Sequence, residues 1–388
     1  MTPAARLSAA IEVLDRVGQG QSAERELTNW ARASRYAGSK DRAAVRDIVF
    51  DVLRMWRSCA AIGGGETGRA RVIGYLRQTG QDIEQLFDGS RHGPSPLEDA
   101  ERHAGRSLEG AEALDLPDWL AQRFEQGLGE QAQSAALAQR QRAPVFLRVN
   151  LAKATRQEAT ARLLQDGILA EPLEDVETAL RVLEGARGIA RSNAYLSGLV
   201  ELQDASSQAV VQALPLKPRM RVLDFCAGGG GKTLAMAARV PDVVIDAHDA
   251  DARRMKDLPE RAKRAGANVR LLDRVSGQYD LVICDVPCSG SGAFRRAPEG
   301  KWRLTEQKLA DLVAIQRQIL QTCANHVGQD GVLVYVTCSV LFEENAGQME
   351  WFQAASHGWR LMGEQQFLPG DAGDGFYVAI VTKGENAI

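Results

Sequence analysis

The sequence predicts an α/β protein in which an open sheet of parallel strands occupies the second half of the chain. Strands and helices alternate from Arg219 onward, and the apolar runs there end in Asp or Cys, as buried parallel strands do at a functional edge. A helical pattern and then a short αβ pattern precede them. We therefore divide the 388 residues into an all-α domain at 1–135, a small αβ subdomain at 136–205 and a large α/β domain at 206–388.

The first domain is Ala-rich, and its apolar residues recur at helical spacing. Leu7, Ile11 and Leu14 form one such face, and residues 45–53 carry another. Residues 63–68 and 89–96 are rich in Gly, Ser and Pro and are expected to be loops. Helices resume at about Pro117, so the sequence predicts a helical bundle.

The small αβ subdomain begins with a short strand at Val145 to Asn150. Thr155 and Glu158 follow it and have the side chains of a capping box, which predicts a helix start. The large domain then supplies five expected strands. They lie at residues 221–224, 243–249, 269–273, 279–285 and 332–336.

Composition excludes several classes of protein. The chain is 45% hydrophobic, has no 18-residue apolar stretch and does not begin like a signal peptide, so a cytoplasmic globular protein is expected. Its six cysteines lack a disulfide framework and include no Cys-x-x-Cys pair, so we expect free thiols and no metal site.

A net charge of −3 gives no overall basic excess, so any nucleic-acid site must be local. Two basic clusters could contact phosphates. The first comprises Arg32, Arg35, Lys40, Arg42, Arg46, Arg54 and Arg57, and the second comprises Arg295, Arg296, Lys301 and Arg303. The alternative for the first cluster is a solvated helix face in which Asp41 and Asp47 flank Arg42 and Arg46.

A glycine cluster at residues 224–233 follows the first expected strand of the large domain. Glycines let the backbone approach a ligand, and a helix from about Lys232 offers free amides. The spacing is neither the dinucleotide nor the Walker pattern. Asp249 could accept hydrogen bonds from ribose hydroxyls, or it could instead cap a helix before Asp251. Asp273 could accept a hydrogen bond from an adenine amino group, or its side chain could simply be solvated.

Two cysteines carry the proposed chemistry. Cys288 and Cys338 each follow a strand, so both should lie at the crevice that the glycine cluster faces. A thiolate adding to carbon 6 of cytosine activates carbon 5, and a sulfonium methyl donor held by the glycines would complete the reaction. Spacing alone does not choose between the two thiols. Cys59, Cys284 and Cys323 lie in apolar periodic segments and are expected to be packing residues.

Four groups of residues resemble the motif series of the Nop/Sun (RsmB-type) RNA cytosine-5 methyltransferases. They are residues 224–233, residues 285–292 with Arg295-Arg296 and Lys301-Trp302, residues 336–339 with Glu343-Glu344-Asn345, and residues 374–377. The resemblance covers about residues 140–388. The helical start, with residues 39–42 and 52–54, resembles the NusB-like RNA-binding domain of bacterial rRNA members.

The resemblance implies a Rossmann-like class I methyltransferase domain that uses S-adenosyl-L-methionine on RNA and works as a monomer. The NusB-like extension favours small-subunit rRNA, while tRNA and large-subunit rRNA stay open as substrates. It implies that Cys338 is the nucleophile, that Cys288 assists breakdown of the covalent adduct and that Asp285 lies near the base. It also implies a set of cofactor-binding residues: Cys226, Ala227, Gly228, Gly229, Gly230, Gly231, Lys232, Asp249, Asp273 and Asp285.

Three alternatives stay open from the sequence. DNA cytosine methyltransferases use a Pro-Cys thiol, which would make Cys288 the nucleophile. Amino-group methylation is disfavoured because Cys288 stands where such sites place an aromatic residue after Pro-Pro. A NusB-like RNA-binding protein with an inactive methyltransferase domain is the alternative from another class.

The glycine cluster departs from the family pattern Cys-Ala-Ala-Pro-Gly-Gly-Lys, because Gly228-Gly229 stand in place of Ala-Pro. The two glycines raise the entropy lost on ordering the loop, which predicts weaker cofactor binding than is typical. Changing them to Ala-Pro should tighten binding by about 0.4 to 1 kcal/mol per residue if both positions adopt the family backbone.

Overall fold

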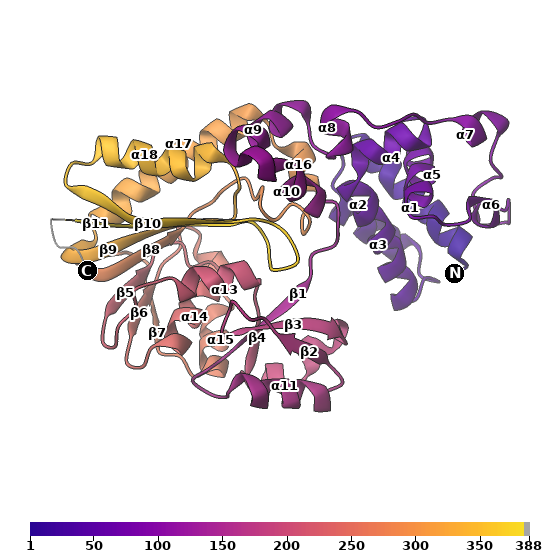
Figure 1. The fold of residues 1–388 in the computed structure, drawn as a ribbon. Helices are drawn as coiled ribbons and strands as arrows, with labels where there is room; N and C mark the ends of the chain where they lie inside the picture. Colours follow the sequence, from indigo (N-terminus) through magenta and orange to yellow (C-terminus); the bar gives the residue numbers. More distant parts are fainter. Residues whose placement is uncertain (384–388) are drawn as a thin grey trace. The chain divides into compact units, whose positions relative to one another are not determined.

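The computed structural model describes residues 1–383, which form two compact units (Figure 1). The first unit contains Met1–Arg142 together with the distant segment Phe294–Leu304. The second contains Ala143–Ala293 and the chain from Thr305 onward. No helix within residues 1–383 is long and apolar enough to cross a membrane.

The first unit is helical, as predicted. Its longer helices are α1 (Pro3–Gly18), α2 (Ala23–Ala33), α3 (Ser39–Arg54), α4 (Trp56–Gly63), α5 (Gly68–Gln78), α9 (Asp118–Leu128) and α10 (Ala132–Ala138). Shorter helices are α6 (Ile83–Leu86), α7 (Asp99–His103), α8 (Gly110–Ala113) and α16 (Glu299–Arg303). Leu7, Leu14 and Val45 are buried in its core. Gly74 permits the close packing of α5 on α4, since a Cβ there would lie 1.9 Å from the Cys59 carbonyl oxygen.

The segment Phe294–Leu304 is bound into this helical unit by hydrogen bonds. Lys301 Nζ donates to the Arg54 carbonyl oxygen at 3.0 Å, and Arg54 Nε donates to the Arg295 carbonyl oxygen at 2.7 Å. Trp302 Nε1 donates to the Leu53 carbonyl oxygen at 2.8 Å. Lys301, Arg295 and Arg54 are buried. The expectation that the second basic cluster contacts phosphates is therefore wrong for Arg295 and Lys301, and Arg54 leaves the first cluster for the same reason.

The small αβ subdomain belongs to the second unit. Its antiparallel sheet has the order β2-β3-β1-β4 and consists of β1 (Val145–Val149), β2 (Leu169–Pro172), β3 (Ala179–Glu184) and β4 (Val200–Leu202). Helices α11 (Arg156–Gln165) and α12 (Asn193–Leu196) accompany it. The predicted capping box is present, since Thr155 Oγ1 accepts from Glu158 N at 3.2 Å and Glu158 Oε2 accepts from Thr155 N at 2.8 Å.

The large sheet has the order β10-β11-β9-β8-β5-β6-β7. The five predicted strands are confirmed as β5 (Arg221–Asp224), β6 (Val244–Ala247), β7 (Val269–Leu271), β8 (Tyr279–Asp285) and β9 (Val327–Thr337), all parallel. Two strands that the sequence analysis did not identify, β10 (Trp359–Phe367) and β11 (Phe376–Lys383), extend the sheet antiparallel beyond β9. Its helices are α13 (Ala205–Gln212), α14 (Gly231–Arg239), α15 (Leu258–Ala265), α17 (Glu306–Ala324) and α18 (Ala346–Ala355).

Strand order locates the site. The chain runs outward from β5 to β6 and β7, then returns to the other side of β5 as β8 and β9. In open α/β sheets, ligands bind at the carboxyl ends of the strands where the order reverses in this way. The loops after β5, β8 and β9 are therefore the place to look for function.

The buried lysine of the inserted segment predicts a pH-dependent stability. Burial lowers the pKa of Lys301 to about 7, and the charges of Arg140 and Arg54 act in the same direction. Only the charge of Asp115 acts to raise this pKa among these causes. In the unfolded chain the pKa is about 10.4. Between these values the unfolded state binds more protons, so Lys301 makes the free energy of unfolding rise with pH, by at most about 1.4 kcal/mol per pH unit.

We expect wild type to gain stability relative to Lys301→Met between pH 7 and pH 10. The free energy of unfolding of wild type minus that of Lys301→Met should therefore rise over this range. Urea denaturation of both proteins at several pH values measures it. A difference that is constant across this range would show that Lys301 keeps its proton in the folded protein.

Candidate functional site

The glycine loop connects β5 to α14 and has a tightly defined backbone. Gly228 and Gly230 have φ angles of 51° and 81°, in the left-handed region. A Cβ on Gly230 would lie 2.1 Å from Leu258 Cδ1. Asp224 fixes the ends of the loop, since its Oδ2 accepts from Thr233 Oγ1 in α14 at 2.6 Å. Burial raises the pKa of Asp224 to about 7.

Two arginines bind carbonyl groups of the loop. Arg148 on β1 donates from Nη1 to the Gly231 carbonyl oxygen at 2.7 Å, and Arg261 on α15 donates to the Gly229 carbonyl oxygen. Arg261 also lies 3.5 Å from the carboxylate of Glu201 on β4. The small subdomain therefore supports the loop at both carbonyls, directly through Arg148 and indirectly through the contact of Glu201 with Arg261. The sequence analysis missed these residues, although an arginine inside the apolar strand β1 was a visible signal.

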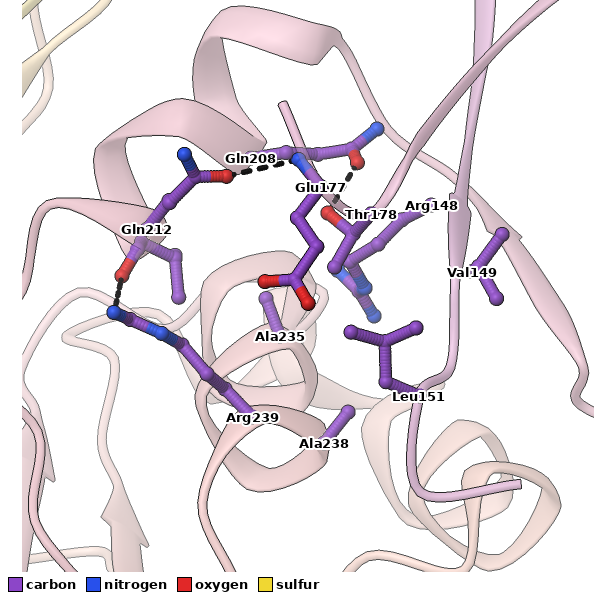
Figure 2. A pocket seen from close by; sticks show the side chains of 11 residues that line it. Arg148, Val149, Leu151, Glu177, Thr178, Gln208, Gln212, Ala235, Ala238 and Arg239 are labelled. Carbon is purple, nitrogen blue, oxygen red and sulfur yellow. Dashed lines mark hydrogen bonds between the residues drawn. The ribbon is translucent and has the colours of Figure 1, made fainter. Parts of the chain in front are cut away.

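Arg148 also lines a small cavity between the small sheet, α13 and α14 (Figure 2). Thr178 Oγ1 donates to Gln208 Oε1 at 2.7 Å, and Glu177 N donates to Gln212 Oε1 at 3.0 Å, which ties the small subdomain to α13. The cavity volume is about 30 Å³, room for water but not for a nucleoside. Burial lowers the pKa of Arg148 to about 10. The hydrogen bonds beside the cavity stabilise the contact between the small subdomain and α13, and the cavity is too small to hold the cofactor.

Of the two acids expected to contact the cofactor sugar and base, Asp249 is buried and Asp273 is exposed. Asp249 Oδ2 accepts from Gly228 N at 2.9 Å and lies 3.1 Å from Arg254 Nη1. Its Oδ1 accepts from Asp251 N at 3.0 Å. Asp249 thus orders the glycine loop and the following turn at the same time. Asp273 follows β7 at the same edge of the sheet.

Lys232 and Asp285 form an ion pair across the crevice. Lys232 Nζ lies 2.7 Å from Asp285 Oδ2 and 5.0 Å from the ring centre of Phe376. Lys232 is 6% exposed and Asp285 is half-buried. The sequence left two roles open for Lys232, the cofactor pocket or the Asp285 side of the site. The contact supports the second.

The thiols of Cys288 and Cys338 lie together. Their Sγ atoms are 3.3 Å apart, and both side chains are half-buried. The loops that carry them are joined directly, since Gly292 N donates to the Cys338 carbonyl oxygen at 2.9 Å. Hydrogen bonding to Cys338, then burial and the charge of Glu344, raise the pKa of Cys288 well above its usual value. Cys59, Cys284 and Cys323 are buried, as predicted.

Asn345 and Glu344 support these loops from the segment after β9. Asn345 Oδ1 accepts from Thr337 Oγ1 at 2.6 Å, and its Nδ2 donates to the Ser339 carbonyl oxygen at 3.0 Å, so it holds the residues on both sides of Cys338. Within the described part of the chain, no cluster of His, Cys, Asp or Glu is arranged to bind a metal ion.

Family comparison assigns most of the chain after residue 115. Residues 211–382 match the family model described as 16S rRNA methyltransferase RsmB/F. Residues 116–188 match the model described as Methyltr_RsmF/B-like, ferredoxin-like domain.

Curated relatives cover nearly the whole chain. Ribosomal RNA small subunit methyltransferase B of Serratia proteamaculans (strain 568) is 29% identical over 425 residues and covers 97% of this chain and 98% of its own length. The enzyme of the same name from Vibrio cholerae serotype O1 is 29% identical over 391 residues, covering 89% and 90%.

Solved structures show the same fold. PH0851 has a TM-score of 0.75 at 23% identity, with 99% of both chains covered. A methyltransferase homolog protein from Pyrococcus horikoshii has a TM-score of 0.61 at 25% identity, covering 70% of this chain and 97% of its own. NSun6 from the same organism, solved with SFG, has a TM-score of 0.61 at 18% identity, covering 70% and 99%. The predicted Rossmann-like fold is confirmed.

The loop geometry changes the expectation for Gly228 and Gly229. The expected tightening by alanine at residue 228 required a backbone that alanine adopts without strain, and Gly228 does not have it: its left-handed φ strains any other residue by about 1 to 2 kcal/mol. Gly229 is not among the residues with positive φ, and its added Cβ would meet only the movable end of Arg261, at 2.9 Å. Proline at residue 229 stays compatible with the loop.

We expect Gly228→Ala to weaken S-adenosylmethionine binding by about fivefold or more, the factor for about 1 kcal/mol. Gly229→Pro should tighten binding by about two- to fivefold only if the cofactor does not bind the Gly229 N–H, because proline restricts the unbound loop but removes that donor. Isothermal titration of each single variant measures both. Tighter binding by Gly228→Ala would mean that the ligand-bound loop does not use this backbone.

Proposed function

We propose that the chain is an S-adenosylmethionine-dependent RNA methyltransferase of the RsmB/F family and that it methylates carbon 5 of a cytosine in small-subunit rRNA; the family match of residues 211–382 and the curated relatives support this. Cys338 is the nucleophile in this proposal, and Cys288 and Asp285 assist it. The observation that carries the proposal is the 3.3 Å separation of the two Sγ atoms, at the carboxyl ends of β8 and β9 and beside β5 with its glycine loop.

The glycine loop fits the cofactor. Among residues 1–383, no acceptor is bonded to the backbone N–H groups of Cys226 and Gly229, and both residues are half-buried in the loop. We propose that residues 226–232, with Asp249, Asp273 and Asp285, hold the cofactor. S-adenosylmethionine supplies an electrophilic methyl group on a sulfonium. The loop amides and carboxylates orient it toward the thiols.

The reaction begins on a base that is unpaired in the RNA, since carbon 6 cannot be reached inside a helix. The Cys338 thiolate forms a bond to carbon 6, and the electron pair of the 5,6 double bond moves into the ring, where N3 takes a proton from water and returns it when the adduct breaks down. Lys232 holds Asp285 Oδ2, which orients Asp285 so that its other oxygen can hydrogen-bond the N3 and amino edge. Carbon 5 would then bond to the methyl group, and the sulfur that carried it would leave with the electron pair of the broken C–S bond as a neutral thioether.

Cys288 is suited to the last step. The hydrogen bond to Cys338 is the largest of the causes that raise the pKa of Cys288. When Cys338 is bonded to carbon 6, that cause is lost and the pKa of Cys288 falls. As a thiolate it can accept the carbon 5 proton, and the electron pair of that C–H bond restores the double bond and releases the Cys338 thiolate.

We expect Cys338→Ala to abolish methyl transfer while leaving S-adenosylmethionine binding within a few fold, because the thiol acts on the base. Cys288→Ala should accumulate a covalent protein–RNA adduct, visible as a denaturant-resistant shifted band. Cys323→Ala, which changes a buried thiol in α17, is the control and should retain turnover.

An adduct formed by Cys338→Ala and not by Cys288→Ala would reverse the two roles. Cofactor binding without turnover on any rRNA substrate in the wild type would favour an RNA-binding protein with an inactive catalytic domain.

RNA contact by the first unit is supported by a groove between α2 and α3. Arg32, Arg35, Arg42 and Arg46 line it together with Trp30. Arg46 is paired with Glu24 at 2.5 Å and Arg42 Nε donates to the Ala37 carbonyl oxygen at 3.0 Å, so Arg32 and Arg35 are the arginines with exposed side chains and no such bond. Tyr36 beside them is 76% exposed and could stack on a base.

We expect Arg32→Ala with Arg35→Ala to weaken RNA binding and to reduce the slope of log affinity against log salt by roughly 0.7 per lost phosphate contact. Arg25→Ala is the matched control, since Arg25 is exposed on the same helix but does not line the groove. Binding is measured by filter retention at several salt concentrations. An unchanged slope would make the groove a solvated helix face.

A further inference from the structure

Glu344 is a buried carboxylate at the centre of the thiol loops. It ends the short helix η4 (Phe342–Glu344) and is 0% exposed. Its Oε1 accepts from Ser289 N at 2.8 Å and from Gln316 Nε2 at 3.0 Å. Its Oε2 accepts from Ser289 Oγ and Ser339 Oγ, both at 2.5 Å. Four donors therefore satisfy one carboxylate.

The donors make Glu344 a link between the two thiols. Ser289 directly follows Cys288, and Ser339 directly follows Cys338. Gln316 Nε2 also donates to the Pro287 carbonyl oxygen at 3.0 Å, so the residue before Cys288 joins the same network. One side chain thus bonds to both loops, which leave neighbouring strands 50 residues apart in the chain.

This carboxylate has no compensating cation. Within residues 1–383, no lysine, arginine or histidine forms an ion pair with Glu344; its partners are two serines and a glutamine. A buried charge without a cation is costly. A glutamine has a single acceptor oxygen and could not accept all four bonds, so the network requires a carboxylate, whose charge also acts on its surroundings.

We propose that Glu344 is a positioning residue for the reaction: it holds the Cys288 and Cys338 loops in register, and its negative charge, placed beside Ser289, acts on the neighbouring Cys288 thiol. This rests on the proposed function only in assigning catalytic roles to the thiols.

The charges around Cys288 support this. On β8, Asp285 is paired with Lys232. Tyr335 on β9 and Gln316 on α17 are neutral, so Glu344 on η4 supplies the uncompensated charge. After its hydrogen bond to Cys338 and its burial, the charges of Cys338 and Glu344 raise the pKa of Cys288. Glu344 therefore favours the protonated form of Cys288. It also makes the Cys288 thiolate a stronger base once Cys338 is occupied.

The test is alkylation of the full-length protein by iodoacetamide without RNA or cofactor, followed at each cysteine by peptide mass spectrometry across pH 6 to 10. In wild type we expect Cys338 to react first and Cys288 slowly. In Glu344→Gln the initial-rate ratio of Cys338 to Cys288 should fall about tenfold, the factor for one pKa unit. Glu343→Gln, the neighbouring carboxylate, is the control and should keep the wild-type ratio.

A second variant separates the charge from the hydrogen bonds. Ser339→Ala removes one loop contact and keeps the charge, so it should lower kcat without moving the alkylation pH profile. Glu344→Gln should lower kcat at least about tenfold with S-adenosylmethionine affinity unchanged. If Glu344→Gln does not fold, Glu344→Asp takes its place. It keeps the charge, so the alkylation rate ratio of Cys338 to Cys288 should change less than tenfold, while the altered loop contacts should lower kcat.

An unchanged alkylation ratio in a folded Glu344→Gln protein would overturn the electrostatic role, and unchanged kcat in both variants would overturn the positioning role. Because alkylation requires no turnover, it reports on Glu344 even if Cys338→Ala were to show that the proposed reaction is wrong.

Discussion

The parallel pairing of β5, β8 and β9 is the constraint on which the site depends. In this register Asp224 lies beside Ile283, and Asp285 beside Val336, so the three strands end at nearly the same level. Parallel strands require crossovers, which is why residues so distant in sequence leave the sheet at one edge. The glycine loop, the Asp285 carboxylate and both thiols meet there because the sheet brings them there, before any side chain contributes.

Holding the site rigid is a separate problem, solved by buried polar contacts. The glycine loop lacks the proline that would restrict it in the unbound state. Arg148, Arg261 and Asp249 instead bind its backbone from three different elements. These bonds form only in the folded protein, so they order the loop without reducing the entropy of the unfolded chain. The small subdomain thereby supports the glycine loop.

Much of this could be predicted from local sequence. The five parallel strands, the capping box at Thr155 and the strand-end positions of Cys288 and Cys338 follow from patterns within a few residues. The partners of Arg148, Arg261 and Glu344 could not be predicted, because each lies on a different element. Glu344 was visible in the motif beside Asn345, but its burial against Ser289 depends on the pairing of β8 with β9.

The feature that local sequence predicts least is the position of residues 294–304. These residues follow the Cys288 loop directly in the chain, yet they belong to the helical unit. Phe294 and Lys301 are buried there, and Lys301 and Trp302 donate to the end of α3. Deleting the first 142 residues would expose the side chains of Phe294 and Lys301, six and thirteen residues beyond Cys288, and remove the acceptors that anchor Lys301 and Trp302. Because this segment continues directly from the Cys288 loop, the role of the helical unit has to be examined by changing surface residues such as Arg32 rather than by truncation.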